Sequence, residues 1–285
     1  MARAGRSSLV AGCWSTPATR NTRAVRLLLL AAGILLASPA RADDPLNTMR
    51  AFCQADGHGA RVDPMSWIAI ANLVTWQLEP AWDHVYLIRG FELSTPQRRD
   101  GEIEIAVQYT VTAEVHSNVV TEVERVDTRT YRLVAGEDRV WRLRAPPPPP
   151  YLFASDVDDE ALAALLGPSG SSYVSDSAFV WGLLREAGWT MPYADTAALA
   201  TAPDFTTERS AEVGDLALYY DGDQPYHVGV VESDDSVVSA TLNGGIRRTP
   251  FGAFAGEIRY RRPIASARAT PTAEPKPTTR PRKRR

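Results

Sequence analysis

Two short stretches in the C-terminal half carry the side chains best suited to chemistry. The first, Ser175-Asp176-Ser177, opens a segment whose apolar residues recur at helical spacing. Those apolar residues are Phe179, Val180, Leu183, Leu184 and Ala187. Asp176 therefore falls in the first turn of a predicted helix, where the helix dipole favours a negative charge. The second stretch opens a predicted strand with His227, whose imidazole is a candidate general base near neutral pH.

Local signals predict the elements that must position these side chains. Ser175 is a predicted N-cap, because a serine hydroxyl accepts a hydrogen bond from a free N–H of the first turn, and Gly188 is a predicted helix stop. A strand is predicted over 216–220, followed by a polar turn at 221–223 and by the strand that begins at His227.

The two stretches resemble motifs of the NlpC/p60 family of bacterial cell-wall peptidases. In that family the first motif usually reads Asp-Cys-Ser-Gly-Phe-Val, and the second reads Pro-Gly-Asp-Leu and leads to His-Val-Gly-Ile. The matching residues here are Ser175-Asp176-Ser177-Ala178-Phe179-Val180, Val213-Gly214-Asp215-Leu216 and His227-Val228-Gly229-Val230-Val231. The resemblance covers about residues 168–263 and implies a papain-like α+β domain.

The resemblance implies a catalytic site at Asp176, His227 and Ser239, with Asp176 in the place of the cysteine nucleophile. A thiol there would be activated by the helix N-terminus and by the imidazole. A carboxylate does not replace it, because acyl transfer from an amide to a carboxylate gives an anhydride far less stable than the starting bond. We expect Asp176 to form a charge-assisted pair with His227 instead.

These residues predict a catalytically inactive pseudo-peptidase that binds peptidoglycan stem peptides or an envelope protein, with no metal and no cofactor. The binding candidates are Tyr173, Ser177 and Tyr226. The alternative is an active cell-wall hydrolase or amidase in which a serine or a metal replaces the thiol. In the metal version, Asp223 would join Asp176 and His227 around zinc.

The chain before this region predicts helices followed by an antiparallel sheet. A dense apolar stretch over 67–78 predicts a buried helix that Pro80 ends. Strict alternation of apolar and polar residues over 103–115 predicts a long half-buried strand, and 119–134 and 140–143 are predicted to continue the sheet. This order is similar to the nuclear-transport-factor-like fold, and the fold class predicted for the whole chain is α+β.

An unbroken proline run at 146–150 predicts a boundary between two domains, because each ring fixes φ and keeps the chain extended. The predicted α+β N-terminal domain is 43–145, the linker is 146–155, and the NlpC/p60-like domain is 156–266.

The two ends of the chain predict export and a basic tail. Residues 1–42 combine arginines, an apolar run and Ala40-Arg41-Ala42, as in a cleaved signal peptide, so the address is predicted to be periplasmic or secreted. A retained membrane anchor is the alternative, although the run is short for a span. Residues 267–285 are rich in Pro, Lys and Arg and predict a disordered tail that could contact an anionic envelope surface.

Charge argues against nucleic acid as the main partner. Residues 43–267 hold 18 Lys and Arg against 33 Asp and Glu, so the body of the chain is acidic. Nucleic-acid binding relies on a basic face that neutralises phosphates. After loss of the leader, Cys53 is the only thiol, which excludes an internal disulfide.

Overall fold

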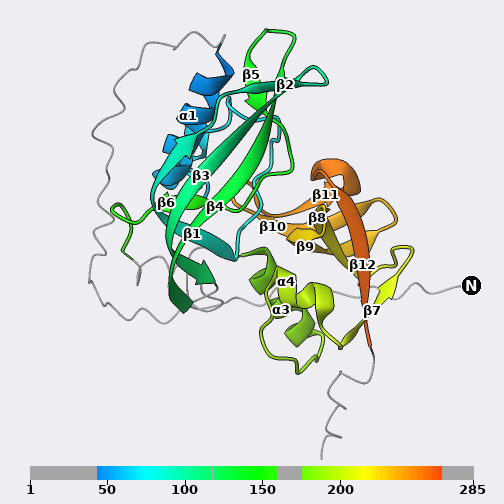
Figure 1. Ribbon diagram of the computed structural model, residues 1–285. Coiled ribbons are helices and arrows are strands. Elements are labelled where there is room, and N and C mark those ends of the chain that lie inside the picture. The colour runs from blue at the N-terminus through cyan, green and yellow to red at the C-terminus, as the bar shows by residue number, and fades with distance from the viewer. Residues whose placement is uncertain (1–43, 117–118, 159–174, 265–285) are drawn as a thin grey trace, which may run out of the picture. The chain divides into compact units, whose positions relative to one another are not determined.

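The computed structural model describes residues 44–116, 119–158 and 175–264 (Figure 1). The predicted leader at 1–42, the basic tail at 267–285 and Tyr173 lie outside the described residues. Within the described ranges, no helix is both long and apolar enough to cross a membrane.

The N-terminal half builds a mixed sheet with the strand order β5-β4-β3-β1-β6, in which β2 pairs with β3. Every pairing is antiparallel except that of β1 with β6. The strands are β1 (His84–Leu93), β2 (Gln97–Arg99), β3 (Glu102–His116), β4 (Val119–Ala135), β5 (Trp141–Leu143) and β6 (Tyr151–Phe153). Helix α1 (Pro45–Gly57) packs against β1, β3, β5 and β6.

The long half-buried strand predicted from alternation is confirmed as β3. Buried and less buried side chains alternate along almost its whole length. The apolar side chains at 103, 105, 107, 111 and 115 face the core, and their polar neighbours face outward. The alternation thus fixes which face of the sheet is covered.

The buried helix predicted over 67–78 is wrong. The structure has only a 3₁₀ turn, η1 (Trp67–Ala69), and Ile68 is 74% exposed. Turns follow over 70–73, and the backbone at Val74 then forms a bridge with β5, where the N–H of Thr75 donates to the carbonyl of Leu143 at 2.9 Å. Tertiary pairing therefore overrides the local apolar signal.

The residues of the predicted linker at 146–155 pack against the first sheet. Tyr151–Phe153 forms strand β6 inside the first sheet, and Tyr151 and Leu152 are buried. The prolines bring the chain back to the edge of β1, where the carbonyl of Pro150 accepts a hydrogen bond from the N–H of Tyr86 at 2.9 Å. The proline run is thus part of the packed structure and not a free spacer.

The C-terminal half builds an antiparallel sheet with the order β11-β10-β9-β8-β12-β7. Its strands are β7 (Phe205–Glu208), β8 (Leu216–Asp221), β9 (Gln224–Ser233), β10 (Ser236–Thr241), β11 (Gly245–Pro250) and β12 (Glu257–Pro263), with the 3₁₀ turn η2 (Phe251–Ala253) between β11 and β12. Helix α3 (Asp176–Glu186) packs against β9 and β10, and α4 (Thr196–Thr201) packs against β9. Helices with one mixed and one antiparallel sheet confirm the α+β class.

The two sheets share one hydrophobic cluster. Val85 and Leu87 of β1 belong to the same buried group as Tyr219 of β8 and Val237 of β10. The described residues all belong to one compact unit. The domain boundary predicted at the proline run remains a prediction, because one hydrophobic cluster contains residues from both sides of it.

Beside this cluster lies a buried group of charges that ties the first half together. Arg61 is fully buried, and its Nη2 lies 2.7 Å from Oε1 of Glu79 and donates to the carbonyl of Pro148 at 2.6 Å. Its Nη1 lies 3.6 Å from Oδ2 of Asp56. The indoles of Trp76 and Trp82 also donate to Glu79, and both tryptophans are buried in the core.

Asp56→Asn should change how stability depends on pH. Burial raises the pKa of Asp56 from 3.8 to about 7, against the opposing effect of Arg61. Because the folded chain then holds this proton more tightly than the unfolded chain, Asp56 makes the free energy of unfolding fall as pH rises from about 4 to about 7. The fall amounts to a few kcal/mol, since one pKa unit is about 1.4 kcal/mol.

Urea unfolding of the wild type and of Asp56→Asn between pH 4 and pH 8 measures this effect. The difference between the two free energies should shift in favour of the variant across that window. Parallel pH profiles would show that Asp56 does not titrate with folding.

Candidate functional site

Helix α3 presents Asp176 at its first position. The hydroxyl of Ser175 accepts a hydrogen bond from the N–H of Ala178 at 3.2 Å, which confirms Ser175 as the N-cap. Gly188 follows the helix with a φ of 90°, a left-handed conformation that suits a glycine stop. The carboxylate of Asp176 is 1% exposed and points into the protein.

Strand pairing places the other two side chains beside it. His227 pairs with Tyr219 of β8, and Ser239 lies on β10, the neighbouring strand on the other side of β9. Asp215, the aspartate of the second motif, fixes the start of β8, because both its oxygens accept hydrogen bonds from Arg262 at 2.9 Å.

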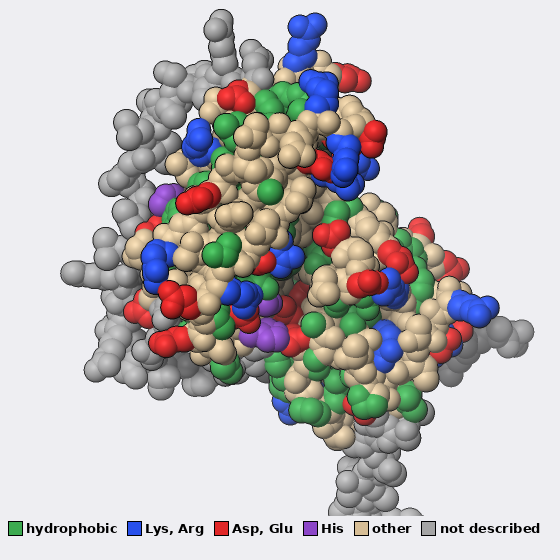
Figure 2. All heavy atoms as spheres, in the orientation of Figure 1, with side chains coloured by type: hydrophobic (Ala, Val, Ile, Leu, Met, Phe, Trp, Pro, Cys, Tyr) green, Lys and Arg blue, Asp and Glu red, His purple; other side chains and the backbone are tan. Residues whose placement is uncertain are grey.

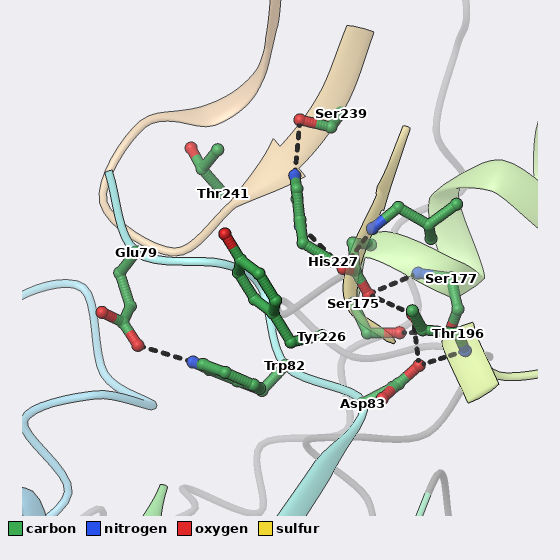
Figure 3. A network of polar contacts seen from close by, with 12 residues as sticks. Glu79, Trp82, Asp83, Ser175, Ser177, Thr196, Tyr226, His227, Ser239 and Thr241 are labelled. Carbon is green, nitrogen blue, oxygen red and sulfur yellow. Dashed lines mark hydrogen bonds and ion pairs between the residues drawn. The ribbon is translucent and has the colours of Figure 1, made fainter. Parts of the chain in front are cut away.

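The three residues predicted as the site form a continuous chain of hydrogen bonds (Figure 3). Nδ1 of His227 lies 2.7 Å from Oδ2 of Asp176, and Nε2 lies 3.0 Å from Oγ of Ser239. An ionised carboxylate only accepts hydrogen bonds, so Nδ1 carries a proton and donates it to Asp176. The predicted pairing of Asp176 with His227 is thus confirmed.

Asp176 accepts hydrogen bonds on both oxygens. Oδ1 accepts from the N–H of Ser177 at 2.7 Å and lies 3.3 Å from the hydroxyl oxygen of Thr196. Oδ2 accepts from His227 and from the N–H of Val228 at 3.0 Å. Burial raises the pKa of Asp176 to about 6, and the hydrogen bond from His227 acts in the opposite direction. The carboxylate therefore has no position left for a ligand.

The site is closed by aromatic side chains as well as by hydrogen bonds. His227 and Ser239 are fully buried. The centroid of the imidazole lies 4.0 Å from that of Phe254 and 5.5 Å from that of Tyr219. In this conformation the imidazole and the serine hydroxyl are sealed from solvent.

The described binding candidates are also internal. The hydroxyl of Ser177 lies 2.7 Å from that of Tyr193, and Tyr226 is buried and donates to the carbonyl of Ala255 at 2.5 Å. The side chain of Asp223 is 95% exposed and lies 3.6 Å from Arg259. Across the described ranges, no three His, Cys, Asp or Glu side chains are arranged to hold a metal ion.

Several residues that complete the site carry no signal in the sequence. Asp83 accepts hydrogen bonds from the N–H and the hydroxyl of Thr196 at 2.9 and 3.1 Å, and the carbonyl of Ala81 accepts from the N–H of Asp176 at 2.8 Å. These contacts join positions about a hundred residues apart, and no motif marks Ala81, Asp83 or Thr196. Only the capping pattern of Asp195 before α4 could have drawn attention to Thr196.

Gly229→Ala should disturb the site without replacing any of its three polar side chains. A Cβ at Gly229 would lie 2.3 Å from Cγ1 of Val237 and 2.9 Å from both Cβ of Ser239 and the carbonyl oxygen of Val238. Strand β10 must move away, at a cost of about 1–3 kcal/mol. Urea unfolding measures the loss, and Gly90→Ala, where a Cβ meets nothing within 4 Å, is the control. Equal stability of the two variants would contradict the close approach.

No protein-family model matches the chain, and a search of curated proteins gives no match. The function therefore has to be argued from the geometry of the site.

Proposed function

We propose that this chain is an exported, catalytically inactive NlpC/p60-like protein that acts by binding in the cell envelope. The observation that supports this most is the closed hydrogen-bond network of Asp176. Its carboxylate stands where the resemblance implies a thiol and accepts from the imidazole that would activate that thiol. The side chain at the nucleophile position thus has a structural role.

The ligand we propose is peptidic: the stem peptides of peptidoglycan, or an envelope protein. On the face shown in Figure 2, acidic and basic side chains are interleaved and do not gather by sign. Such a surface suits ligands that carry both charges, as stem peptides and proteins do. It offers no continuous basic track of the kind that nucleic acid requires.

Binding to purified sacculi tests this proposal. The protein should sediment with sacculi, and the bound fraction should fall when soluble muropeptides are added in excess. Retention that soluble muropeptides do not compete would favour an envelope protein, which cross-linking in intact cells would then capture. A protein that neither sediments nor cross-links would contradict the proposal.

The same geometry favours one other function, that of a serine hydrolase. Ser239, His227 and Asp176 are linked in the order in which a serine nucleophile, its base and the orienting carboxylate are linked in hydrolases. Against this function, Ser239 is fully buried and lies on a strand behind the imidazole. A nucleophile must reach a substrate carbonyl, which this serine cannot do in the present conformation.

A fluorophosphonate probe separates the two functions, because it reacts only with an activated and accessible serine. We expect no labelling of the wild type. Labelling at Ser239 that disappears in His227→Ala would establish the hydrolase. Labelling that persists in His227→Ala would be non-specific and would leave the binding function in place.

A further inference from the structure

A segment from the first half of the chain lies across the site, and we call residues 79–83 the groove segment. It begins at the end of β10, where the carbonyl of Glu79 accepts a hydrogen bond from the N–H of Leu242 at 2.8 Å. Pro80 forms an antiparallel bridge with Thr241. The segment thus pairs with the end of β10 through one isolated bridge, beside the labelled Glu79 and Thr241 in Figure 3.

The centre of the groove segment meets the N-terminus of α3. The carbonyl oxygen of Ala81 accepts a hydrogen bond from the N–H of Asp176 at 2.8 Å. N–H groups in the first turn of a helix have no acceptor within the helix and are free to bind a ligand oxygen. In acyl transfer, a backbone N–H beside the nucleophile holds the oxygen of the carbonyl under attack. Ala81 therefore offers its carbonyl where a substrate carbonyl would lie.

The end of the groove segment is anchored by two buried side chains. The indole of Trp82 donates to Glu79 at 2.6 Å, and its ring lies 6.4 Å from that of Tyr226. Asp83 is 8% exposed and accepts both hydrogen bonds from Thr196. The hydroxyl of Thr196 also lies 3.3 Å from Oδ1 of Asp176, so the anchor and the site share one residue.

We propose that the groove segment is an intramolecular occupant of the peptide position, with the carbonyl of Ala81 in the place of a scissile carbonyl. This inference rests on the proposed NlpC/p60-like function. In the resting fold the position is filled by a peptide segment held by a backbone bridge to the end of β10, by one helix N–H and by an aspartate anchor. An external peptide can reach this position only after the groove segment leaves it.

Asp83→Ala tests the proposal by weakening the anchor, and Asp63→Ala is its matched control. Asp63 also accepts one backbone N–H and one hydroxyl, from Met65 and Ser66, but at an exposed turn. The readout is amide hydrogen exchange at Asp176. We expect strong protection in the wild type and in Asp63→Ala, and exchange that is about ten-fold faster or more in Asp83→Ala. Fast exchange at Asp176 in the wild type would overturn the proposal.

A second measurement tests whether a thiol reagent can reach the side chain at position 176. In Asp176→Cys, alkylation by iodoacetamide at position 176 is followed by mass spectrometry of peptides, which separates this thiol from the buried Cys53. Alkylation should be slow, and adding Asp83→Ala should accelerate it by about ten-fold or more, whereas Asp63→Ala should not. Equal rates in all three proteins would overturn the proposal. If Asp176→Cys does not fold, amide hydrogen exchange at Asp176 in Asp83→Ala tests the proposal by itself.

Neither measurement involves peptidoglycan. A protected Asp176 amide in a protein that neither binds sacculi nor cross-links to an envelope protein would contradict the proposed function and leave the proposed occupant in place. Binding to sacculi together with fast exchange at the Asp176 amide would support the proposed function and overturn the proposed occupant.

Discussion

Asp176→Ala is expected to lower the free energy of unfolding by about 3–5 kcal/mol, because several buried donors lose their acceptor together. The donors left without a partner are Nδ1 of His227 and the N–H groups of Ser177 and Val228. Each buried unsatisfied group costs about 1–3 kcal/mol. Urea unfolding at neutral pH measures the loss.

Two variants separate this effect from the simple loss of an aspartate at a helix start. Asp44→Ala removes an exposed cap that accepts one N–H, from Leu46, and should cost about 0.5–2 kcal/mol. Asp176→Asn keeps the shape of the side chain but turns an NH₂ group toward the donors on one side. Its loss of stability should therefore fall between those of Asp176→Ala and Asp44→Ala. A loss for Asp176→Ala no larger than that for Asp44→Ala would show that the buried network contributes little.

The second large effect is expected from Arg61→Met, which should cost about 3–5 kcal/mol. Methionine fills much of the same space but leaves the carboxylates of Glu79 and Asp56 buried without a counter-charge. It also removes the hydrogen bond to Pro148, which holds the proline run against the first half. The loss comes mainly from the uncompensated charges and not from packing.

A double variant tests that explanation. Adding Asp56→Asn to Arg61→Met removes one of the two unpaired charges, so at pH 8, where Asp56 is ionised in the folded wild type, it should restore part of the lost stability. Unfolding of the wild type, both single variants and the double variant gives the coupling. Strictly additive losses would mean that Arg61 acts through its packing on Phe52 and Trp82.

The parts of the fold that the sequence predicts correctly are those governed by local physics. The alternation that produces β3 follows from one covered face, and Ser175 and Gly188 bound α3 because their conformations suit the two ends of a helix. The pairing of Asp176, His227 and Ser239 could also be predicted, because the motifs carry both the residue types and their order.

The parts that could not be predicted depend on contacts between distant segments. The apolar residues before Pro80 looked helical, yet their backbone pairs with β5, and the residues after the prolines form β6. The closure of the site comes from Ala81 and Asp83, about a hundred residues before the helix that they contact. The acceptor of a backbone N–H cannot be read from composition or spacing, since any residue has a carbonyl.

We propose that the chain keeps the arrangement of a peptidase site but has no group that can attack an amide. Incubation of the purified protein with sacculi, followed by mass spectrometry of the soluble muropeptides, tests it most directly. We expect the same soluble muropeptides with and without the protein, and the same soluble muropeptides from the wild type and from His227→Ala. Cleaved stem peptides that appear with the wild type and are lost in His227→Ala would contradict the claim.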